Sequence, residues 1–542
     1  MKPVEDFLTR WKVWRDTRIN RLRLRTLTRR VARAESQVAH HKGSVVVFNA
    51  STRLGNLSLN AAFSALIAWG LRVSGRRVIH FVCQAGMSRC LLGTSEDNPD
   101  KAPPCANCTA FSRSLYANAN VFEFHYQQDA KLTGKLKDKQ VADLYDFTFK
   151  GLPLGKIVLP SLRWRMRRHN LAEDRTTNFL FKEFIKSAYQ VAKSFTELLE
   201  KENPSAVIVF NGQMFPEAVV RYLAEQHGLT VLSHETGLQP YTVYITKQQA
   251  TARRVFLTED ELHLTDAQNA HMDRHLEKRF RGKFSMAGIE FWKDMQGLSE
   301  EIQTKLGQFK QMVPVFTNVI FDTSQVHANV GFLDMFAWLA ETRKIMEEYP
   351  ETLFVVRAHP DEKRPGSDKQ SNETVEDWVK RHGMADLPNV VFIDSLDYIS
   401  SYELIHRSKF VLAYNSSVAL ESVLLDKLSV CAGWAWYADY STGVFPQTQA
   451  EYRKTVTGLL ETDQPIVVPE EYRQNARGLL YYQNFRCSVP FGRYLEPHQI
   501  VGYARMKMFD PSELSEAYDP SIHAIVQTLE SDQQVVTIPA AD

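Results

Sequence analysis

Long hydrophobic runs, cysteine and net charge are all scarce in this chain of 542 residues. The longest apolar stretch, Leu57 to Leu71, contains Ser and Asn and is shorter than the roughly 20 residues that a bilayer-spanning helix needs. The first apolar residues are interrupted by Glu5, Asp6, Arg10 and Lys12, which does not fit the pattern of a secretory signal peptide. These features predict a cytoplasmic protein.

Only six cysteines are present, and four of them lie between Cys83 and Cys108, which does not fit a secreted disulfide framework. The positions Cys83, Cys90, Cys105 and Cys108 have the spacing C-x6-C-x14-C-x2-C. A C-x2-C pair is a common half of a zinc site, so structural zinc that holds a loop is one hypothesis. A redox-labile pair and four unlinked thiols are the alternatives.

The formal net charge of +2 argues against nucleic acid as a partner of the whole molecule. The charge is unevenly spread, because residues 1 to 35 hold eleven Lys or Arg against four acids. Arg alternates there with Trp, Val, Ile and Leu, as in a helix that lies on an anionic membrane surface. Residues 1–40 are therefore one candidate for contact with the inner membrane face. The alternative is a solvated basic helix that packs on its own domain.

After Gly43 the sequence alternates between apolar strands and helices. The segments SVVVFNAS, RVIHFVCQAG, AVIVFN and LTVLSHETG are typical of buried parallel strands. A second series begins at PVFTNVIFDTS and continues through LFVVRAHP, NVVFIDS, FVLAYNSS and LSVCAGW. The pattern predicts an α/β protein with two doubly wound, Rossmann-like sheets that face a cleft at their carboxyl edges.

The expected organisation has four parts. A basic helical arm spans residues 1–43, and a first Rossmann-like domain, with the cysteine-rich loop and a helical insertion, spans residues 44–300. A second Rossmann-like domain spans residues 310–480. A helical tail over residues 481–542 is expected to pack back on the first domain.

Polar side chains follow two strands of the second series. Arg357 and His359 stand two residues apart at the end of VVRAHPDE, and residues at that spacing in a strand share one face. His-Pro must leave the sheet there, because Pro ends the hydrogen-bonded ladder. We expect His359 to donate to a bound phosphate; the alternative is a structural histidine.

A helix start follows another strand of this series, in AYNSSVALESVLLDK. Free N–H groups and hydroxyl side chains at a helix start bind phosphate, so Asn415, Ser416 and Ser417 are expected to contact phosphate oxygens. Glu421 lies one turn further on and is placed to accept from ribose or donor-sugar hydroxyls. An ordinary helix cap explains the same residues. Together with His359, the pattern predicts a pocket for a diphosphate or nucleoside monophosphate, hence a nucleotide-sugar enzyme.

Three short motifs stand in order along the chain: Glu235-Thr236-Gly237, His359-Pro360 and Ser416-Ser417. They resemble motifs of bacterial GT-B glycosyltransferases, in particular the capsule-polysaccharide-synthesis enzymes and the bacterial sialyl- and Kdo-transferases. VFNGQMFPEAVVRYLAEQHGLTVLSHETG also resembles their acceptor domain, and the resemblance covers roughly residues 205–440. Sialyltransferases often carry two acids before the Gly, where this chain has Glu and Thr.

The resemblance implies a peripheral-membrane glycosyltransferase that moves a sugar from a nucleotide-sugar donor to a surface polysaccharide or glycolipid acceptor. CMP-activated ulosonic acids are the donors that the resemblance favours, with UDP and GDP sugars as alternatives. Glu235 would be the base, with His234 as the second candidate; a loop carboxylate beside a structural histidine is the alternative. We expect metal-independent transfer without a required cofactor, because no DxD-like motif is found in the donor domain.

The acceptor side is expected at the strand ends of the first sheet. The candidates are Arg53 and Asn56 after the first strand and Asn211 and Gly212 after another, with Asp322 and Thr323 facing them from the second domain. Each of these is also a common turn residue. Three other functions stay open: a teichoic-acid type polyol-phosphate transferase, a sugar-nucleotide epimerase or hydrolase, and a non-catalytic polysaccharide assembly protein.

Overall fold

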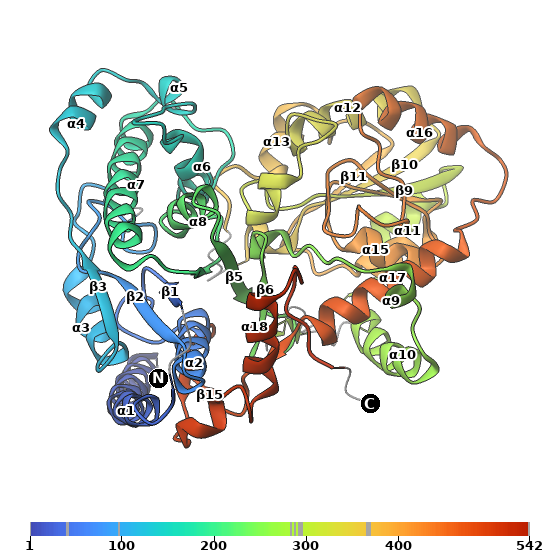
Figure 1. Cartoon of the computed structure of the whole chain (residues 1–542). Helices are drawn as coiled ribbons and strands as arrows, with labels where there is room; N and C mark the ends of the chain where they lie inside the picture. The colour runs from blue at the N-terminus through green and yellow to red at the C-terminus, as the bar shows by residue number, and fades with distance from the viewer. Residues whose placement is uncertain are drawn as a thin grey trace.

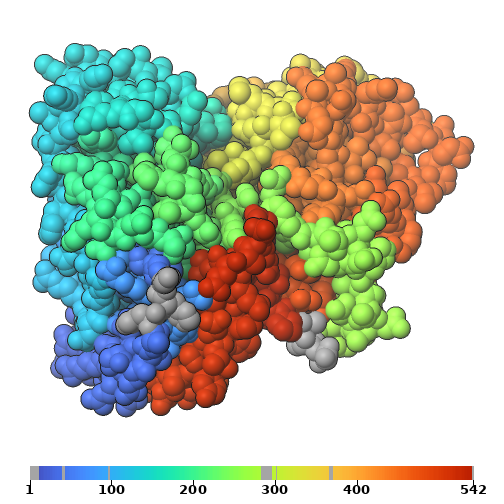
Figure 2. Space-filling view, viewed as in Figure 1, coloured from blue at the N-terminus to red at the C-terminus, as the bar shows by residue number. Residues whose placement is uncertain are grey.

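Two α/β domains lie side by side in this computed structural model (Figure 1), which describes residues 2–39, 43–95, 98–281, 285–286, 289–290, 296–364 and 370–539. They form two lobes in the space-filling view (Figure 2). Each lobe holds a mainly parallel sheet with helices on its faces. The expected fold class, two Rossmann-like doubly wound domains in a GT-B arrangement, is confirmed.

The first sheet has the order β14-β6-β5-β4-β1-β2-β3, and β1 to β5 are parallel. The order reverses between β1 and β4, so the ligand crevice of this sheet is expected at their carboxyl ends. The two remaining strands, β6 and β14, run antiparallel at one edge. The strand bounds are β1 Ser44–Phe48, β2 Arg77–Cys83, β3 Asn120–Phe124, β4 Ala206–Phe210, β5 Thr230–Thr236, β6 Thr242–Thr246 and β14 Val489–Pro490.

The second sheet is wholly parallel and has the order β11-β10-β9-β12-β13. Taken in chain order, this repeats the winding of the five parallel strands of the first sheet, and the order here reverses between β9 and β12. Each domain thus has its own crevice. The strands are β9 Gln311–Phe316, β10 Thr352–Arg357, β11 Val390–Ile393, β12 Val411–Ala413 and β13 Ser429–Cys431.

Helices cover both sheets, and most described helices begin at a Ser, Thr or Asp whose side chain accepts from the first turn, as in α2, α7 and α12. In the first domain the helices are α1 Lys2–Glu35, α2 Leu59–Val73, α3 Cys105–Leu115, α4 Ala130–Leu136, α5 Val141–Leu144, α6 Leu154–Met166, α7 Arg175–Glu202, α8 Glu217–Gln226 and α18 Pro520–Glu530. Those between residues 250 and 481 are α9 Glu259–Leu262, α10 Asp266–Phe280, α11 Glu300–Leu306, α12 Met335–Glu348, α13 Val375–Arg381, α14 Ser401–Arg407, α15 Val418–Leu424, α16 Gln449–Glu461 and α17 Glu470–Tyr481. No helix of the described residues is both long and apolar enough to cross a bilayer.

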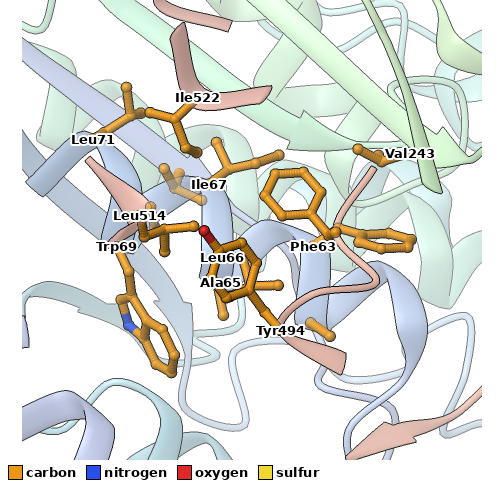
Figure 3. Packing of buried hydrophobic residues seen from close by; sticks show 14 of the residues in the cluster. Phe63, Ala65, Leu66, Ile67, Trp69, Leu71, Val243, Tyr494, Leu514 and Ile522 are labelled. Carbon is orange, nitrogen blue, oxygen red and sulfur yellow. The ribbon is translucent and has the colours of Figure 1, made fainter. Parts of the chain in front are cut away.

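Helix α2 is buried on nearly every side because it lies between the first sheet and the end of the chain (Figure 3). Phe63 and Ile67 belong to the same core cluster as Val243 of the sheet and Ile522 of α18. At Gly70 an added Cβ would lie 2.4 Å from Ile522 Cδ1, so the close approach of α18 requires glycine there. The end of the chain therefore completes the core of the first domain.

Two expectations about domain organisation need correction. Helices α9 and α10 pack on the second domain, where Leu262 and Met272 share a core cluster with Leu479, so the domain boundary lies near residue 250 and not near residue 300. The tail is not wholly helical, because it also contains β14 and the hairpin of β15 (Leu495–Pro497) and β16 (Ala504–Met506). Short apolar strands of two or three residues give too little pattern to be recognised in a sequence.

Candidate functional site

Two neighbouring cavities open at the carboxyl edges of the two sheets. The larger cavity, of about 590 Å³, lies at the reversal point of the first sheet and is closed on one side by residues of the second domain. The smaller cavity, of about 330 Å³, lies at the carboxyl edge of the second sheet. Arg253 and Trp436 line both cavities, so the two spaces meet at these side chains.

Glu235 lies near the end of β5 and lines the larger cavity. Its Oε1 accepts from Asn60 Nδ2 at 2.8 Å and from the Thr236 backbone N–H at 2.9 Å. Its Oε2 accepts from Asn211 Nδ2 at 3.0 Å. The following Gly237 is held against Thr242, where a Cβ would come within 3.0 Å of the Thr242 carbonyl carbon. The carboxylate is therefore fixed in one orientation at the cavity wall.

His234 points to the opposite face of β5, because successive side chains of a strand alternate. It is fully buried, does not line either cavity, and lies against Phe210 with a ring-centroid distance of 5.8 Å. Burial lowers the pKa of His234 to about 3, so the ring is neutral at physiological pH. This position favours Glu235 over His234 as the base.

The four acceptor candidates of the first domain fall into two groups. Arg53 and Asn211 line the larger cavity, and the Asn211 amide holds Glu235. Gly212 does not line it; its positive φ of 75° serves the sharp turn after β4. Asn56 lies just behind the wall, 3.1 Å from His498 Nε2. The side chains at this wall are thus Arg53 and Asn211, while Gly212 and Asn56 support it.

The second-domain side of the larger cavity is formed by Asp322, Thr323 and Asn415. β9 ends at Phe316, so Asp322 and Thr323 do not end that strand as expected; Asp322 instead precedes the short 3-10 helix Thr323–His327. Asn415 was expected at the donor pocket. Its Oδ1 accepts from Asn318 and from Gln325 at 2.8 and 3.1 Å, which ties it to the interdomain wall.

Arg357 and His359 both line the smaller cavity, at the end of β10. Arg357 Nη1 donates to the backbone oxygen of Asp397 at 2.9 Å, whereas its buried Nε and Nη2 have no hydrogen-bond partner in the part of the chain that the structure describes. Burial lowers the pKa of Arg357 to about 10, so it stays charged at neutral pH. His359 Nδ1 accepts from the Asp361 backbone N–H at 3.1 Å, which leaves the proton of the neutral ring on Nε2. This edge of the cavity can therefore donate to an anion.

Ser416 and Ser417 also line the smaller cavity, together with Glu421. Helix α15 behind them has only seven residues. We therefore expect the serine side chains to contribute more to phosphate binding than the dipole of this short helix does. Glu421 is already occupied: Arg279 Nη2 donates to its Oε1 at 2.5 Å and Tyr402 to its Oε2 at 2.6 Å. A sugar hydroxyl would have to share this carboxylate with Arg279, 142 positions earlier in the chain.

Arg253 is a cavity residue that the sequence reasoning missed. It follows the 3-10 helix Ala250–Ala252, adopts a positive φ of 50°, and lies over the Tyr244 ring at 5.8 Å. One guanidinium nitrogen, Nη2, donates to the Thr236 carbonyl at 2.7 Å, and the buried Nη1 meets no hydrogen-bond partner within the described ranges. Its charge therefore lies between the carboxylate of Glu235 and the smaller cavity. No recognisable motif surrounds it in the sequence.

Glu217, the first residue of α8, also lines the larger cavity and was also missed. The Ala50 backbone N–H donates to its Oε1 at 2.8 Å. Burial raises the pKa of Glu217 to about 7, the range in which a carboxyl can exchange protons at physiological pH. The only signal in the sequence was its place after a strand end and Pro216.

All four clustered cysteines line the larger cavity. Cys108 Sγ lies 3.3 Å from Ser51 Oγ, and the Gly93 backbone N–H donates to Cys90 Sγ at 3.2 Å. Burial raises the pKa of Cys90 to about 12 and raises that of Cys83 further. Among the described residues, no group of three or more His, Cys, Asp or Glu is placed to hold a metal ion. Structural zinc at these cysteines stays a prediction.

The two cavities carry different kinds of side chain. The smaller cavity gathers Arg357, His359, Arg253 and two serine hydroxyls, a set suited to a phosphate group. The larger cavity gathers fixed and buried carboxylates at the first sheet. A bond between a phosphate in one cavity and a group in the other would lie beside Arg253.

No family model matches the sequence, and no curated protein matches it. Solved structures similar to this chain include a Thermosulfurimonas dismutans KpsC beta Kdo 2,4 transferase (16% identity, TM-score 0.33, covering 51% of this chain and 80% of that chain). A Thermosulfurimonas dismutans KpsC beta Kdo 2,7 transferase has 13% identity and a TM-score of 0.32, covering 62% and 89%. Neisseria meningitidis UDP-GlcNAc 2-epimerase bound to UDP-GlcNAc has 12% identity and a TM-score of 0.24, covering 81% and 98%. The TM-scores are low, so the reaction is inferred from the cavity residues.

Proposed function

We propose that this protein is a glycosyltransferase that binds a nucleotide sugar in the smaller cavity and an acceptor hydroxyl in the larger one. The observation that carries the proposal is the meeting of the two cavities at Arg253, with phosphate-binding groups on one side and the fixed carboxylate of Glu235 on the other. Surface polysaccharide or glycolipid is the proposed acceptor class.

In the proposed reaction, Glu235 takes the proton of the acceptor hydroxyl while the acceptor oxygen bonds to the anomeric carbon of the donor sugar. The bond between that carbon and the phosphate oxygen breaks, and its electron pair leaves with the phosphate. His359 Nε2–H, Arg253 and Arg357 stabilise the charge that develops there. No metal ion is needed in this scheme, because side chains supply the positive charge.

A CMP-activated ulosonic acid is the proposed donor, with UDP and GDP sugars as the alternatives. Such a donor carries two anionic groups, one phosphate and one sugar carboxylate. Arg357 and Arg253 each offer guanidinium N–H groups that have no hydrogen-bond partner among the described residues, which supports a donor with two separated anions. The serine hydroxyls of Ser416 and Ser417 would complete the phosphate contacts.

The test is product analysis after incubation of the purified protein with a panel of CMP, UDP and GDP sugars and a polysaccharide or glycolipid acceptor. A new glycosidic bond with release of the free nucleotide supports the proposal. A phosphodiester product would assign the polyol-phosphate transferase reaction instead. Conversion of a nucleotide sugar without any acceptor would assign an epimerase or hydrolase, and no conversion with any donor would favour an assembly protein.

A further inference from the structure

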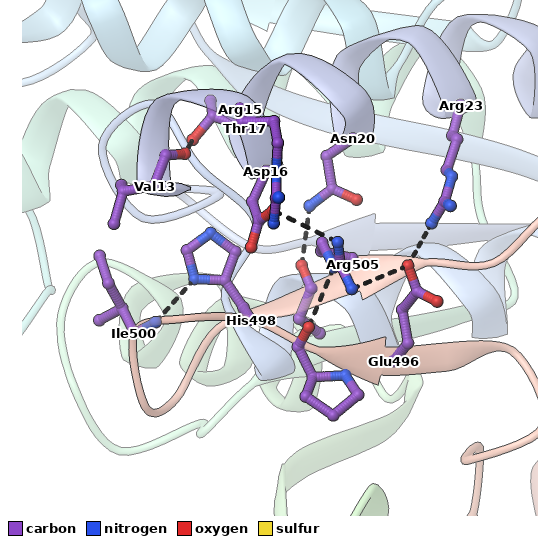
Figure 4. Close-up of polar contacts among 12 residues, drawn as sticks. Val13, Arg15, Asp16, Thr17, Asn20, Arg23, Glu496, His498, Ile500 and Arg505 are labelled. Atoms are coloured by element: carbon purple, nitrogen blue, oxygen red, sulfur yellow. Dashed lines mark hydrogen bonds and ion pairs between the residues drawn. The ribbon is translucent and has the colours of Figure 1, made fainter. Parts of the chain in front are cut away.

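Helix α1 has one face that is fixed to the first domain. Leu24, Leu27 and Val31 are fully buried in its core. Towards its N-terminal half, polar side chains such as Asn20 hold α1 to the β15–β16 hairpin (Figure 4). Asn20 Nδ2 donates to the Ala504 carbonyl at 2.8 Å, and Asn20 Oδ1 accepts from the Met506 N–H at 2.9 Å. Helix α1 is therefore packed against the first domain and held in a fixed position on it.

Two ion pairs add to this attachment. Arg505 lies 3.3 Å from the buried Asp16, and Arg23 lies 2.5 Å from Glu496 of β15 (Figure 4). These ion pairs occupy the carboxylates of Asp16 and Glu496. Between residues 11 and 35 the only acids are Asp16 and Glu35, and Glu35 pairs with Arg72 at 2.6 Å. The side-chain charges of α1 that are left over between residues 11 and 35 are therefore positive.

The opposite face of α1 is exposed and combines tryptophan with cations. Trp11 and Trp14 are 48% and 55% exposed, and Leu22 is 58% exposed. Cations line the same face at helical spacing: Lys12, Arg18, Arg25, Arg29, Arg30 and Arg33 are all exposed. These nine residues form the outer face of α1. Anionic lipids attract such a cation row, and Trp side chains prefer the boundary between headgroups and acyl chains.

The hairpin next to α1 also exposes apolar side chains at its tip. Ile500 and Val501 are 41% and 69% exposed. The same tip forms part of the rim of the larger cavity: Gly502 lines the cavity, and Tyr503 stacks under the Arg53 guanidinium at 5.7 Å. The exposed apolar tip and the cavity wall are thus formed by consecutive residues.

We infer that the outer face of α1 and the hairpin tip Ile500–Val501 form a contact surface for an anionic membrane. The apolar side chains enter the headgroup region while the cations meet lipid phosphates. A polyanion such as nucleic acid would match the cations but not the exposed Trp, Ile and Val. The membrane contact itself does not depend on the proposed reaction. The consequence for the acceptor does rest on the proposed reaction. With the hairpin tip at the bilayer, the larger cavity would open beside the membrane, towards a lipid-linked acceptor.

The experiment is sedimentation of the full-length protein with vesicles of pure phosphatidylcholine and with vesicles in which a quarter of the lipid is phosphatidylglycerol. We expect binding only to the anionic vesicles, weakening as salt is added. The variant R25E/R29E should bind at least about tenfold less, since each cation near an anionic surface contributes to attraction. K131E/K137E is the matched control: it makes the same charge change at and just after α4, at the other end of the domain in Figure 1, and should bind as the unchanged protein does.

The apolar part is tested separately with W11A/W14A and I500S/V501S, whose side chains are exposed and not needed for the core. Each pair should weaken vesicle binding several-fold, and brominated lipid should quench tryptophan emission in the unchanged protein but much less in W11A/W14A. Equal binding by all variants, or equal loss in R25E/R29E and K131E/K137E, would overturn the proposal. So would tight binding of a DNA duplex that is lost in R25E/R29E while brominated lipid quenches nothing.

Vesicle binding is measured without any nucleotide sugar, so its failure is distinguishable from failure of the proposed reaction. The consequence for the acceptor has its own readout. I500S/V501S should raise KM for a lipid-linked acceptor several-fold and leave KM for the nucleotide sugar unchanged. An equal effect on both KM values would show that the tip supports the cavity and does not face a membrane.

Discussion

The Asn211 side-chain amide donates a hydrogen bond of 3.0 Å to Glu235 Oε2, joining the carboxyl ends of the neighbouring strands β4 and β5. Asn60 of α2 holds the other carboxylate oxygen at 2.8 Å. The carboxylate is therefore oriented by side-chain amides from two other segments, in addition to the Thr236 N–H of its own strand. Such an arrangement positions a base before the substrate arrives.

Glu235→Gln is expected to lower kcat by at least about 100-fold, because an amide cannot take the proton of the acceptor hydroxyl. The substitution keeps the size of the side chain, so the melting temperature should change little. Steady-state transfer assays and thermal unfolding measure the two quantities. Glu200→Gln, on the exposed side of α7, is the control. Near-normal turnover of Glu235→Gln would remove Glu235 from the mechanism.

Arg253→Lys is expected to weaken nucleotide binding and to lower kcat, because lysine cannot donate to the Thr236 carbonyl and to a phosphate with the geometry of a guanidinium. We expect a fall of about tenfold or more in kcat/KM for the donor. The neighbouring Arg254→Lys is the matched control, since Arg254 is paired with Asp439 at 3.0 Å outside both cavities. Equal effects of the two substitutions would contradict a special role for Arg253.

Glu217→Gln is expected to change the dependence of stability on pH. Burial raises the pKa of Glu217 to about 7 from its usual 4.5, so the folded state binds this proton more tightly than the unfolded state does. The free energy of unfolding should therefore fall as pH rises from about 4.5 to about 7, by about 3 kcal/mol from this group. Urea unfolding across this range should show a smaller fall in Glu217→Gln; the same fall in both proteins would contradict the prediction.

Structural zinc at Cys83, Cys90, Cys105 and Cys108 is tested by elemental analysis of anaerobically purified protein. About one zinc per chain is the predicted result, lost in C105S/C108S. Burial keeps Cys83 and Cys90 as neutral thiols in the metal-free protein, so added zinc should also release protons. Absence of bound metal in the unchanged protein would end the zinc hypothesis.

Much of the fold could be predicted from the sequence because buried parallel strands are continuous apolar runs, and both sheets consist of such runs. The domain boundary near residue 250 could not be predicted, because α9 and α10 are placed on the second domain by the packing of Leu262 and Met272 against residues about 200 positions later. Likewise, strand alternation shows that His234 and Glu235 face opposite ways, but not which of the two faces the cavity.

The candidate site was predicted best where residues follow directly on a strand. Arg357 is the last residue of β10, His359, Ser416 and Ser417 come two to four residues after a strand ends, and all four line the smaller cavity. Arg253 follows a 3-10 helix after the first sheet and reaches the site only because the two domains meet there. Glu421 was expected to be available to sugar, and its pairing with Arg279 depends on a contact between distant segments.

The most direct test of the account is a thermal-shift screen against CMP, UDP, GDP and CDP with the unchanged protein, His359→Ala and Glu235→Gln. A ligand that binds only the folded state stabilises it, by about 2.7 kcal/mol at a concentration 100 times its Kd. The account predicts that one nucleotide raises the melting temperature of the unchanged protein and of Glu235→Gln, and that His359→Ala loses this increase. An increase that survives in His359→Ala, or none with any nucleotide, would contradict a nucleotide site in the smaller cavity.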